Sequence, residues 1–373
     1  MFPTDVEALT VAWLNGVLSD GSAAVIDFQA EKLGEQGRTS VVYVLTLTYD
    51  RATALPTKVV AKFSAGEQYV KNAVQALNVF EREVLFYRHF GDQAGIPVPH
   101  CYAAEYSREE NACVLLLELV VNARQPDLFH GTVAEVALAV EHLAPFHARW
   151  WGRRELPGDV PCDYDRPELY VADVTKALNK IPEEHRDNVG RTVIEVLELW
   201  LQHHRQLAAY CRTLPLTLCH GSFHRQQLLF PTAENDPFRV IDWQSTGMDC
   251  GPIDLARLIV TGLLPDDRKK HEAPLVARYH ALLCEHGVTD VSLAQVWEMY
   301  QLGIVRILVL HIHVFAHFSV KLMIEHWRKV AEERSLWKIL FQWPQQALLE
   351  HDVPALLRRL ASQASVPAAG GPS

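Results

Sequence analysis

Several patterns that identify common classes of protein are missing from this 373-residue sequence. The seven cysteines are odd in number and scattered, without any CxxC spacing, so no disulfide framework is indicated and reduced thiols in a cytosol are expected. No clusters of Lys and Arg are present and the formal net charge is -10, which argues against binding to the phosphate backbone of nucleic acids.

Signals for a membrane or for secretion are also missing. The most apolar stretch, Leu302 to Val320, is interrupted by an arginine and three histidines, which makes it a poor membrane span. The first residues carry acidic side chains and no basic region, so they do not resemble a secretory signal. We therefore expect a soluble, cytoplasmic protein that binds neither nucleic acid nor membrane.

The sequence does contain enough apolar residues for a large core, with 49% hydrophobic residues and nine Trp. Its length exceeds that of a usual single domain, so two lobes are expected. Apolar and polar residues alternate from Ser40 to Tyr49 and from Lys58 to Phe63, and Cys113 to Leu119 is almost continuously apolar. These patterns predict strands, and Tyr69 to Phe90 has the pattern of a helix.

Helical patterns dominate after residue 120. Thr132 to Trp150 begins with a capping box of Thr132 and Glu135, and two short apolar runs, Leu228 to Phe230 and Phe238 to Trp243, indicate a small hairpin. The sequence therefore predicts an α+β chain with two lobes. Residues 1–119 would form an antiparallel-sheet lobe with one long helix, and residues 120–373 a larger, mainly helical lobe.

The strongest local signal is the segment from His220 to Gln227, which reads His-Gly-Ser-Phe-His-Arg-Gln-Gln. It is followed by Ile-Asp-Trp at residues 241–243 and by Asp-Leu-Ala at residues 254–256. These segments resemble the superfamily of aminoglycoside phosphotransferases and ecdysteroid or choline kinases, whose catalytic loop reads His-Gly-Asp-x-His-x-x-Asn. The order and spacing match, and the resemblance extends over nearly the whole chain.

The resemblance implies a protein-kinase-like fold that uses ATP and Mg²⁺ to phosphorylate a hydroxyl of a small molecule. Phosphoryl transfer depends mainly on charge neutralisation. By this resemblance Lys62 would contact the nucleotide phosphates, Asp242 and Gln227 would hold Mg²⁺, and Asp254 would brace the catalytic loop. Gln227 stands where the family has Asn, and it retains a carbonyl oxygen.

Each of these charged residues could also have an ordinary structural role. On position alone, Asp242 is equally well a strand-end cap, and Lys62 a lysine that extends from the sheet to solvent. Glu83 borders the apolar face of the predicted helix and is the expected partner of Lys62. Glu81 is the competing candidate, and either glutamate could simply be exposed.

Two further segments are expected at the nucleotide. The loop with Gly34, Gly37 and Ser40 lies where a loop would cover the phosphates, although it lacks the full GxGxxG spacing and also suits an ordinary turn. By analogy with the hinge of the family, the adenine would lie against Glu118 and Leu119.

The catalytic loop departs from the family pattern at Ser222, where the family has the aspartate that acts on the substrate hydroxyl. General-base assistance is worth about 10²–10⁴-fold in rate, so the site would be slow, re-specialised or inactive. His220 and His224 flank the serine. Either one is a candidate substitute base, and bracing of the loop by their rings is the alternative.

Two other chemistries were weighed. His313 and His317 are four residues apart on a predicted helix, a spacing that can bind zinc, but there is no HExxH motif and histidines of a pocket or core fit equally well. A serine hydrolase based on Ser222 would lack the GxSxG turn. The sequence also indicates aromatic and imidazole side chains for an acceptor pocket in the helical lobe, or for its core: Trp150, Trp151, Trp297, His313, His317 and Trp327.

Overall fold

The computed structural model describes residues 2–33, 39–64, 77–153, 155–181, 183, 186–316 and 337–363. The chain divides into two compact units. The first comprises residues 1–124, 157–160 and 229–246, and the second comprises residues 125–156, 161–228 and 247–373. The predicted fold class is confirmed, because the first unit carries an antiparallel sheet and the second is mainly helical.

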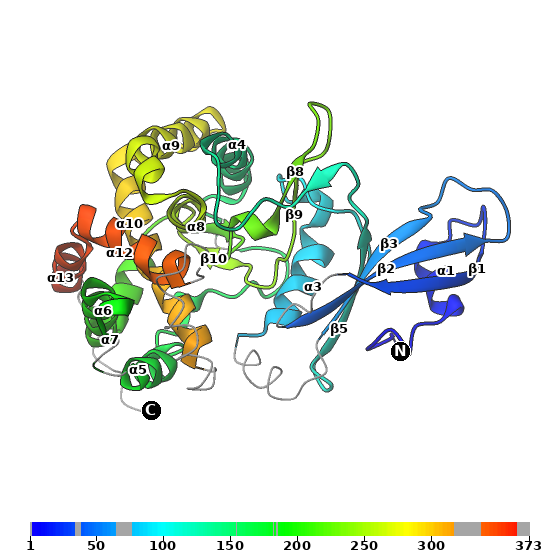
Figure 1. Ribbon diagram of the computed structural model, residues 1–373, viewed down its shortest axis with the longest axis horizontal. Coiled ribbons are helices and arrows are strands. Elements are labelled where there is room, and N and C mark those ends of the chain that lie inside the picture. The colour runs from blue at the N-terminus through cyan, green and yellow to red at the C-terminus, as the bar shows by residue number, and fades with distance from the viewer. Residues whose placement is uncertain are drawn as a thin grey trace. The chain divides into compact units, whose positions relative to one another are not determined.

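The sheet of the first unit has five strands in the order β1-β2-β3-β5-β4, and all neighbours are antiparallel (Figure 1). The three predicted strands are present, each within one residue of its predicted ends. The bounds are β1 (Val25–Lys32), β2 (Ser40–Tyr49), β3 (Lys58–Ser64), β4 (Cys101–Ser107) and β5 (Ala112–Glu118).

The two faces of β3 differ as its alternation predicts. Val59, Ala61 and Phe63 are buried in an apolar cluster that also takes in Leu14 and Leu18 of helix α1 (Val11–Leu18). Because side chains alternate along a strand, Lys62 leaves the sheet on the opposite face. The sequence pattern therefore places a lysine at the centre of the sheet and away from the apolar cluster.

Helix α3 spans Val79–His89 and is followed by the short 3-10 helix η1 (Gly91–Gln93). The single helix predicted from Tyr69 to Phe90 is not continuous, because Leu77 and Asn78 form a turn and Asn78 has a left-handed φ of 53°. Asparagine tolerates this conformation, which ends the helical pattern on its N-terminal side. Residues 69–76 lie outside the described part of the chain.

The predicted hairpin is present but belongs to the first unit, not to the helical lobe. Strands β6 (Ala123–Arg124), β8 (Leu228–Pro231) and β9 (Arg239–Val240) form a small sheet. Trp243, just after β9, stacks on Phe86 of α3 with ring centroids 3.6 Å apart. The units therefore divide the chain differently from the predicted boundary after residue 119, because this later segment packs on the first unit.

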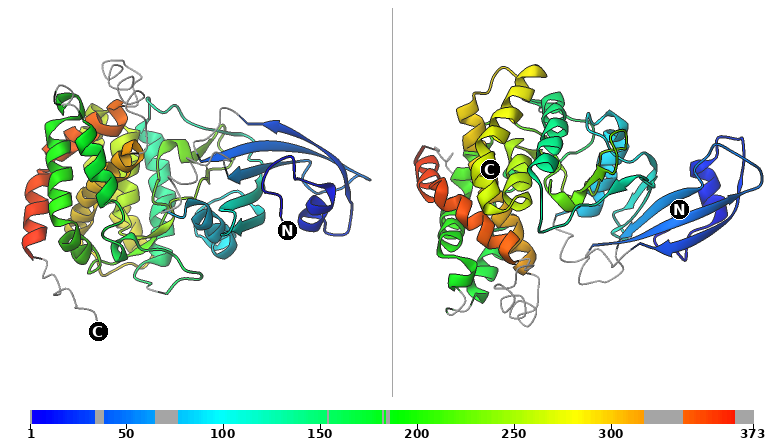
Figure 2. Two further views of the ribbon diagram at one scale, coloured as in Figure 1. Left: turned by 90° about the horizontal axis from the view of Figure 1, so that it is seen from below. Right: turned by 45° about the horizontal axis from the view of Figure 1, so that its top comes forward.

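The second unit is built from helices that pack around α8 and α10, with α13 against α7 (Figures 1 and 2). Helix α4 has the predicted capping box, in which Thr132 and Glu135 exchange hydrogen bonds. A two-stranded ladder joins β7 (Thr217–Cys219) to β10 (Gly247–Asp249). The helices are α4 (Val133–Trp150), α5 (Val171–Lys180), α6 (Arg186–Val189), α7 (Arg191–Cys211), α8 (Pro252–Gly262), α9 (Pro265–Glu285), α10 (Leu293–Ala316), α12 (Trp343–Glu350) and α13 (Val353–Gln363), with the short turns η2 (Asp163–Asp165), η4 (Arg225–Gln227) and η5 (Lys338–Gln342).

Within the described residues, one segment, Leu293–His313 of α10, is long and apolar enough to cross a membrane by length and composition alone. However, 56% of its most apolar window is buried inside the protein, and core helices of soluble proteins have the same properties. Gly303 allows α8 to approach, because a β-carbon there would lie 2.9 Å from Ile253 Cα. This segment therefore has the packing of a core helix.

Candidate active site

Three charged side chains from distant parts of the sequence meet in the first unit. Lys62 Nζ on β3 lies 2.7 Å from an oxygen of Glu83 on α3 and 2.7 Å from Asp242 Oδ1 after β9. The side chains of Lys62, Glu83 and Asp242 are 12%, 2% and 19% exposed. The structure thus brings together the three residues to which the sequence assigned nucleotide and metal binding, and it selects Glu83 over Glu81, which is paired with Arg108.

Burial and charge act on this triad in opposite directions. Burial alone would lower the pKa of Lys62, but the adjacent Asp242 and Glu83 carboxylates outweigh it and raise that pKa, so the ammonium stays charged. Burial raises the pKa of Glu83 to about 6, with the nearby Asp242 carboxylate acting in the same direction and Lys62 against both. With two carboxylates and one ammonium group, the ionised triad has a net negative charge. A further cation would therefore be attracted to it.

Asp242 is held by its neighbours in an unusual backbone conformation. Its φ is 68°, a left-handed value that costs about 1 kcal/mol for a residue with a β-carbon. Stacking of Trp243 on Phe86 and a bond from Val240 N–H to Pro97 O (2.9 Å) fix the chain on both sides of it. The surrounding packing therefore holds Asp242 in a strained backbone conformation with its carboxylate against Lys62. Such strain is common at functional sites.

A hydrogen-bond chain reaches the second oxygen of this carboxylate. Gln244 Nε2 donates to Asp242 Oδ2 (3.0 Å), and Thr39 Oγ1 donates to Gln244 Oε1 (2.9 Å). Thr39 directly precedes β2, at the end of the loop that was expected to cover phosphates. The sequence analysis did not identify this contact of Gln244. The position of Gln244, two residues after Asp242, could have indicated it.

The other residues predicted to contact the nucleotide are described only in part. Ser40 begins β2 and is buried, and its hydroxyl makes no hydrogen bond within the described residues. Glu118 ends β5 and accepts a bond from His100 N–H (3.1 Å), while Leu119 follows the strand and is half-buried. Gly34 and Gly37 lie outside the described residues, so the phosphate-loop role stays a prediction.

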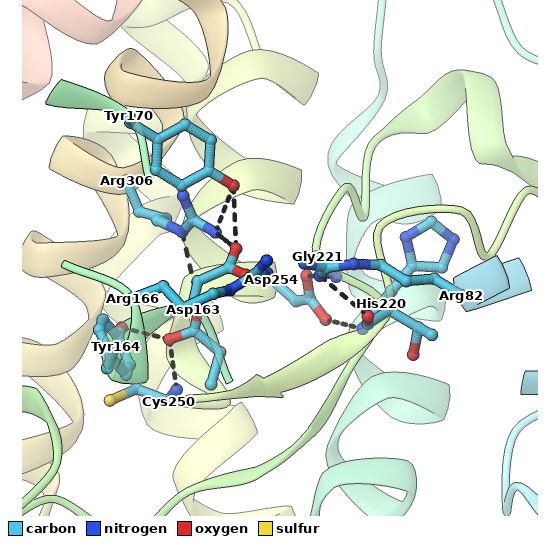
Figure 3. A network of polar contacts seen from close by, with 12 residues as sticks. Arg82, Asp163, Tyr164, Arg166, Tyr170, His220, Gly221, Cys250, Asp254 and Arg306 are labelled. Atoms are coloured by element: carbon cyan, nitrogen blue, oxygen red, sulfur yellow. Dashed lines mark hydrogen bonds and ion pairs between the residues drawn. The ribbon is translucent and has the colours of Figure 1, made fainter. Parts of the chain in front are cut away.

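In the second unit, a buried aspartate braces the catalytic loop (Figure 3). Asp254, in the first turn of α8, accepts bonds from the N–H groups of His220 (2.6 Å) and Gly221 (2.9 Å). Gly251 permits close packing here, since a β-carbon on it would lie 2.7 Å from Tyr279 Oη. The bracing role implied for Asp254 agrees with these contacts.

His147 was not singled out from the sequence, yet it completes this brace. Its Nε2 lies 3.4 Å from Asp254 Oδ2 and its Nδ1 lies 2.7 Å from Tyr279 Oη. Ligand atoms of His147, Cys219 and Asp254 come within 4.8 Å of one another, a spacing that could suit a metal ion. Both oxygens of Asp254 are already hydrogen-bonded to the loop backbone, which favours bracing over metal binding.

Both loop histidines accept backbone hydrogen bonds. His220 is fully buried and its Nδ1 accepts from Ser222 N–H (3.2 Å), while His224 Nδ1 accepts from Gln226 N–H (3.3 Å). The hydroxyl of Ser222 makes no hydrogen bond in the described part of the chain. These contacts are the bracing contacts, and the role of either ring as a substitute base stays a prediction.

Gln227 lies at the end of the loop, with its Nε2 3.5 Å from His224 Nε2. It belongs to the second unit and Asp242 to the first. Their joint role as ligands of Mg²⁺ therefore stays a prediction.

Arg225 is an anchor that the sequence reading missed. This arginine is buried and donates to the carbonyl oxygens of Asp127 and His130 (3.1 Å for the latter) and to Glu135 (2.9 Å). It ties the catalytic loop to the start of α4. Arginine is usually exposed, so the sequence offered no reason to place this one in the interior.

Of the residues proposed for an acceptor pocket, the four that the structure describes have separate surroundings. Trp151 donates to Asp290 (3.2 Å), Trp297 packs on Tyr300, and His313 Nδ1 lies 2.8 Å from Asp173. Trp150 is buried at the end of α4. His317 and Trp327 lie outside the described residues, so the zinc hypothesis is not tested.

Comparison with known proteins provides the context for these contacts. No curated protein matches the chain. Similar solved structures include a choline/ethanolamine kinase family protein from Mesorhizobium loti, with 16% identity, coverage of 89% and 92% of the two chains and a TM-score of 0.44. A choline kinase from Streptococcus pneumoniae has 12% identity, coverage of 86% and 96% and a TM-score of 0.47. An ethanolamine kinase from Plasmodium vivax has 11% identity, coverage of 89% and 83% and a TM-score of 0.48.

The sequence itself gives the decisive match. The profile of the ecdysteroid kinase-like family matches residues 35–289, which is more than half of the chain and contains the triad and the catalytic loop. The resemblance predicted from the motifs is thereby confirmed: this chain belongs to the ecdysteroid kinase-like family.

Proposed function

We propose that the protein is an ATP-dependent phosphotransferase that moves the γ-phosphate to a hydroxyl group of a small organic molecule. The observation that carries this proposal is the triad of Lys62, Glu83 and Asp242, in a chain of the ecdysteroid kinase-like family. A buried lysine held between two carboxylates is the arrangement that positions nucleotide phosphates and a metal ion in kinases. The acceptor is a hydroxyl compound that the family resemblance does not identify further.

The charges of the triad suit Mg²⁺. One lysine faces two carboxylates, and carboxylate oxygens are preferred ligands of this cation. In this proposal Asp242 and Gln227 would hold the metal, which would supply positive charge to the transferring phosphoryl group. Lys62 keeps its bond to Glu83 and turns its remaining donors to the phosphates.

The transfer step itself is simple in terms of bonds. The hydroxyl oxygen of the acceptor forms a bond to the γ-phosphorus while the bond from that phosphorus to the bridging oxygen of ADP breaks. The hydroxyl proton goes to solvent or to the phosphoryl group, because Ser222 supplies no carboxylate at this point of the loop. We therefore expect a rate about 10²–10⁴-fold below that of a homologue with aspartate here.

Thermal unfolding with and without Mg²⁺ and ATP tests the nucleotide site. At about 100 times the dissociation constant, ligand binding adds about 2.7 kcal/mol of apparent stability, which raises the Tm by several degrees. We expect the wild type to show this shift and Asp242→Ala to lose it.

A matched control is Glu234→Ala, in the exposed turn before β9, which should keep the full shift. Absence of any Mg²⁺-dependent shift in the wild type at millimolar ATP would rule out the proposal. A shift that survives in Asp242→Ala would instead remove this aspartate from the metal site.

A second candidate function is favoured by Ser222, namely a catalytically impaired pseudokinase that binds nucleotide and regulates a partner. Asp254 accepts hydrogen bonds from the backbone N–H groups of His220 and Gly221, so these bonds of the loop do not require a carboxylate at position 222. ADP release that rises with an added hydroxyl compound supports the enzyme. Nucleotide binding without such release, in both the wild type and Ser222→Asp, supports the pseudokinase.

The cellular setting is part of the same proposal. All seven cysteines are free, which agrees with the predicted reduced thiols. We place the protein in the cytoplasm, where ATP and reduced thiols coexist.

A further inference from the structure

A cavity lies within the second unit and apart from the residues assigned to phosphoryl transfer. Its volume is about 590 Å³, which includes the space open to solvent at its mouth. It is lined by residues of η2, α7, α10 and α13, and no residue of the catalytic loop lines it. Because this volume counts open solvent, the space for a ligand is smaller than 590 Å³, and we take a single ring as the size to test.

Part of the cavity wall, on α7 and α10, is aliphatic. Leu207 and Ala208 on α7 lie on its lining together with Leu302 and Val305 on α10. These side chains are buried, so they belong to a fixed wall and not to a mobile surface. A ligand buried here gains free energy from contact with apolar surface.

Arg306 lies at a polar end of the cavity, and Figure 3 shows its contacts. Through Nη2 this arginine donates to Asp163 and to the hydroxyl of Tyr170 (3.2 Å), and its guanidinium carbon lies 4.7 Å from the centre of the Tyr170 ring. Its Nε lies 3.6 Å from Asp249 Oδ2. Among the described residues, none accepts a hydrogen bond from Nη1, so this nitrogen still has hydrogens to donate.

The charges at this end are balanced. Two carboxylates, Asp163 and Asp249, lie beside two guanidinium groups, because Arg166 Nη2 is 3.2 Å from Asp163 Oδ1. A cationic ligand would find the face of Tyr170 already covered by Arg306. An anionic ligand would lose hydration without meeting net positive charge. A neutral head group with an oxygen acceptor fits best.

We propose that this cavity binds a neutral molecule of about one ring that carries a hydroxyl group. The ring lies against the aliphatic wall of α7 and α10, and the hydroxyl oxygen accepts a hydrogen bond from Arg306 Nη1. This inference goes beyond the proposed phosphoryl transfer and does not depend on it, since the two use different residues.

Calorimetric titration of the full chain with p-cresol tests the proposal, without nucleotide or acceptor present. Three matched probes have the same ring. Toluene has no polar head group, benzoate has an anionic one and benzylamine has a cationic one. We expect saturable one-to-one binding of p-cresol. The affinity for each comparison compound should be lower by a factor of about ten or more.

Variants locate the binding in this cavity. Ala208→Phe fills it from α7 and Leu302→Phe from α10, and each should weaken p-cresol binding by about tenfold or more. Gln202→Phe adds the same ring on the exposed side of α7 and should leave binding unchanged. Arg306→Lys should remove the preference for p-cresol over toluene, because the lysine lacks the second donor arm.

Three results would overturn the proposal. They are no saturable binding of p-cresol to the wild type at about 10 mM, unchanged binding in a folded Ala208→Phe or Leu302→Phe variant, and benzoate or benzylamine binding as tightly as p-cresol. The wild-type titration alone decides the question if neither filled variant folds. Each of these results would leave the Mg²⁺-ATP shift, and with it the proposed phosphotransferase, unaffected.

Discussion

Asp242 and Asp254 both follow the catalytic loop in the sequence, but their surroundings in the structure differ. Asp254 is enclosed in the second unit, where its oxygens accept two backbone N–H groups and approach His147. Asp242, in the first unit, is 19% exposed and has a strained backbone, and Lys62 lies against it. One carboxylate accepts hydrogen bonds within the fold, while the other is held in a costly backbone conformation beside a lysine.

This difference separates structure from chemistry within one motif. A buried carboxylate with all its partners in the protein stabilises the fold, and its loss leaves polar groups unpaired. A carboxylate that shares one lysine with a second acid gains more from a bound cation than from the protein alone. Four substitutions test this contrast, from the largest expected change in stability to the smallest.

Replacement of Asp254 should cause the largest loss of stability. Asp254→Ala leaves the N–H groups of His220 and Gly221 without an acceptor in the interior, and we expect the free energy of unfolding to fall by about 3–5 kcal/mol. Urea denaturation measures it.

Asp266→Ala is the control for the helix-dipole effect, because Asp266 occupies the first turn of α9 and is exposed. This control should cost less than about 1 kcal/mol. A similar small cost for Asp254→Ala would show that the loop does not depend on this brace.

Removal of the lysine from the triad should come next. Lys62→Met leaves the Glu83 and Asp242 carboxylates close together without the positive charge between them, which we expect to cost about 3 kcal/mol at pH 7.5. The cost should shrink at pH 5, because protonation of a carboxylate relieves the repulsion. Urea denaturation at both pH values checks this.

Lys58→Met offers the matched control, since Lys58 is on the same face of β3 and is exposed. It should change stability by less than about 0.5 kcal/mol at either pH. Equal costs for the two lysines would contradict the idea that the triad is an electrostatic unit.

The pKa of Glu83 predicts a pH dependence of intermediate size. Burial raises the pKa of this carboxyl from 4.5 to about 6 in the folded protein. The protonated form is thus favoured by folding, so its contribution is fully present below pH 4.5 and is lost as the pH rises through 6. Relative to Glu83→Gln, the wild type should lose about 2 kcal/mol between about pH 4 and pH 7.

Glu81→Gln, also on α3 but paired at the surface, should show no such trend against the wild type. Chemical denaturation across this pH range gives the comparison. A wild type that gains stability relative to Glu83→Gln with rising pH would mean that Lys62 outweighs burial.

The smallest change in stability is expected for Gln244. Gln244→Ala removes one hydrogen bond to Asp242, which should cost about 1 kcal/mol, and should weaken Mg²⁺-ATP binding by about tenfold through looser positioning of the carboxylate. Thermal shifts over a range of nucleotide concentrations measure both effects.

Thr39→Val removes only the outer bond of the chain, from Thr39 to Gln244, and serves as the graded control. Its effect on nucleotide binding should be smaller than that of Gln244→Ala. Unchanged binding in Gln244→Ala would restrict this residue to packing.

Local sequence patterns predicted the elements that depend on their own residues. Alternation found β2 and β3, a continuous apolar run found β5, and a capping box placed the start of α4 at Thr132. The same alternation placed Lys62 on the face of β3 away from the apolar cluster. The break before α3 was missed because the left-handed turn at Asn78 is a property of single residues, which periodicity does not detect.

The motif also predicted most of the candidate site, but through resemblance and not through geometry. Asp242 was named as a metal ligand and Glu83 as the partner of Lys62, and the structure brings both carboxylates within hydrogen-bond distance of Lys62. Arg225, His147 and Gln244 were not found, because their roles depend on neighbours that are far away in the sequence. Burial of a charged side chain is costly unless such partners exist, and sequence alone does not show them.

What the sequence by itself determined is the family, the strand and helix patterns and the residue types of the motifs, including the serine at position 222. Only the tertiary structure decided that the segment around Asp242 belongs to the first unit, that Glu83 and not Glu81 pairs with Lys62, and that Asp254 is fully used by the catalytic loop. The reason is physical. Periodicity and capping act over a few residues, whereas ion pairs, ring stacking and the burial of charge join residues up to 180 positions apart in the chain.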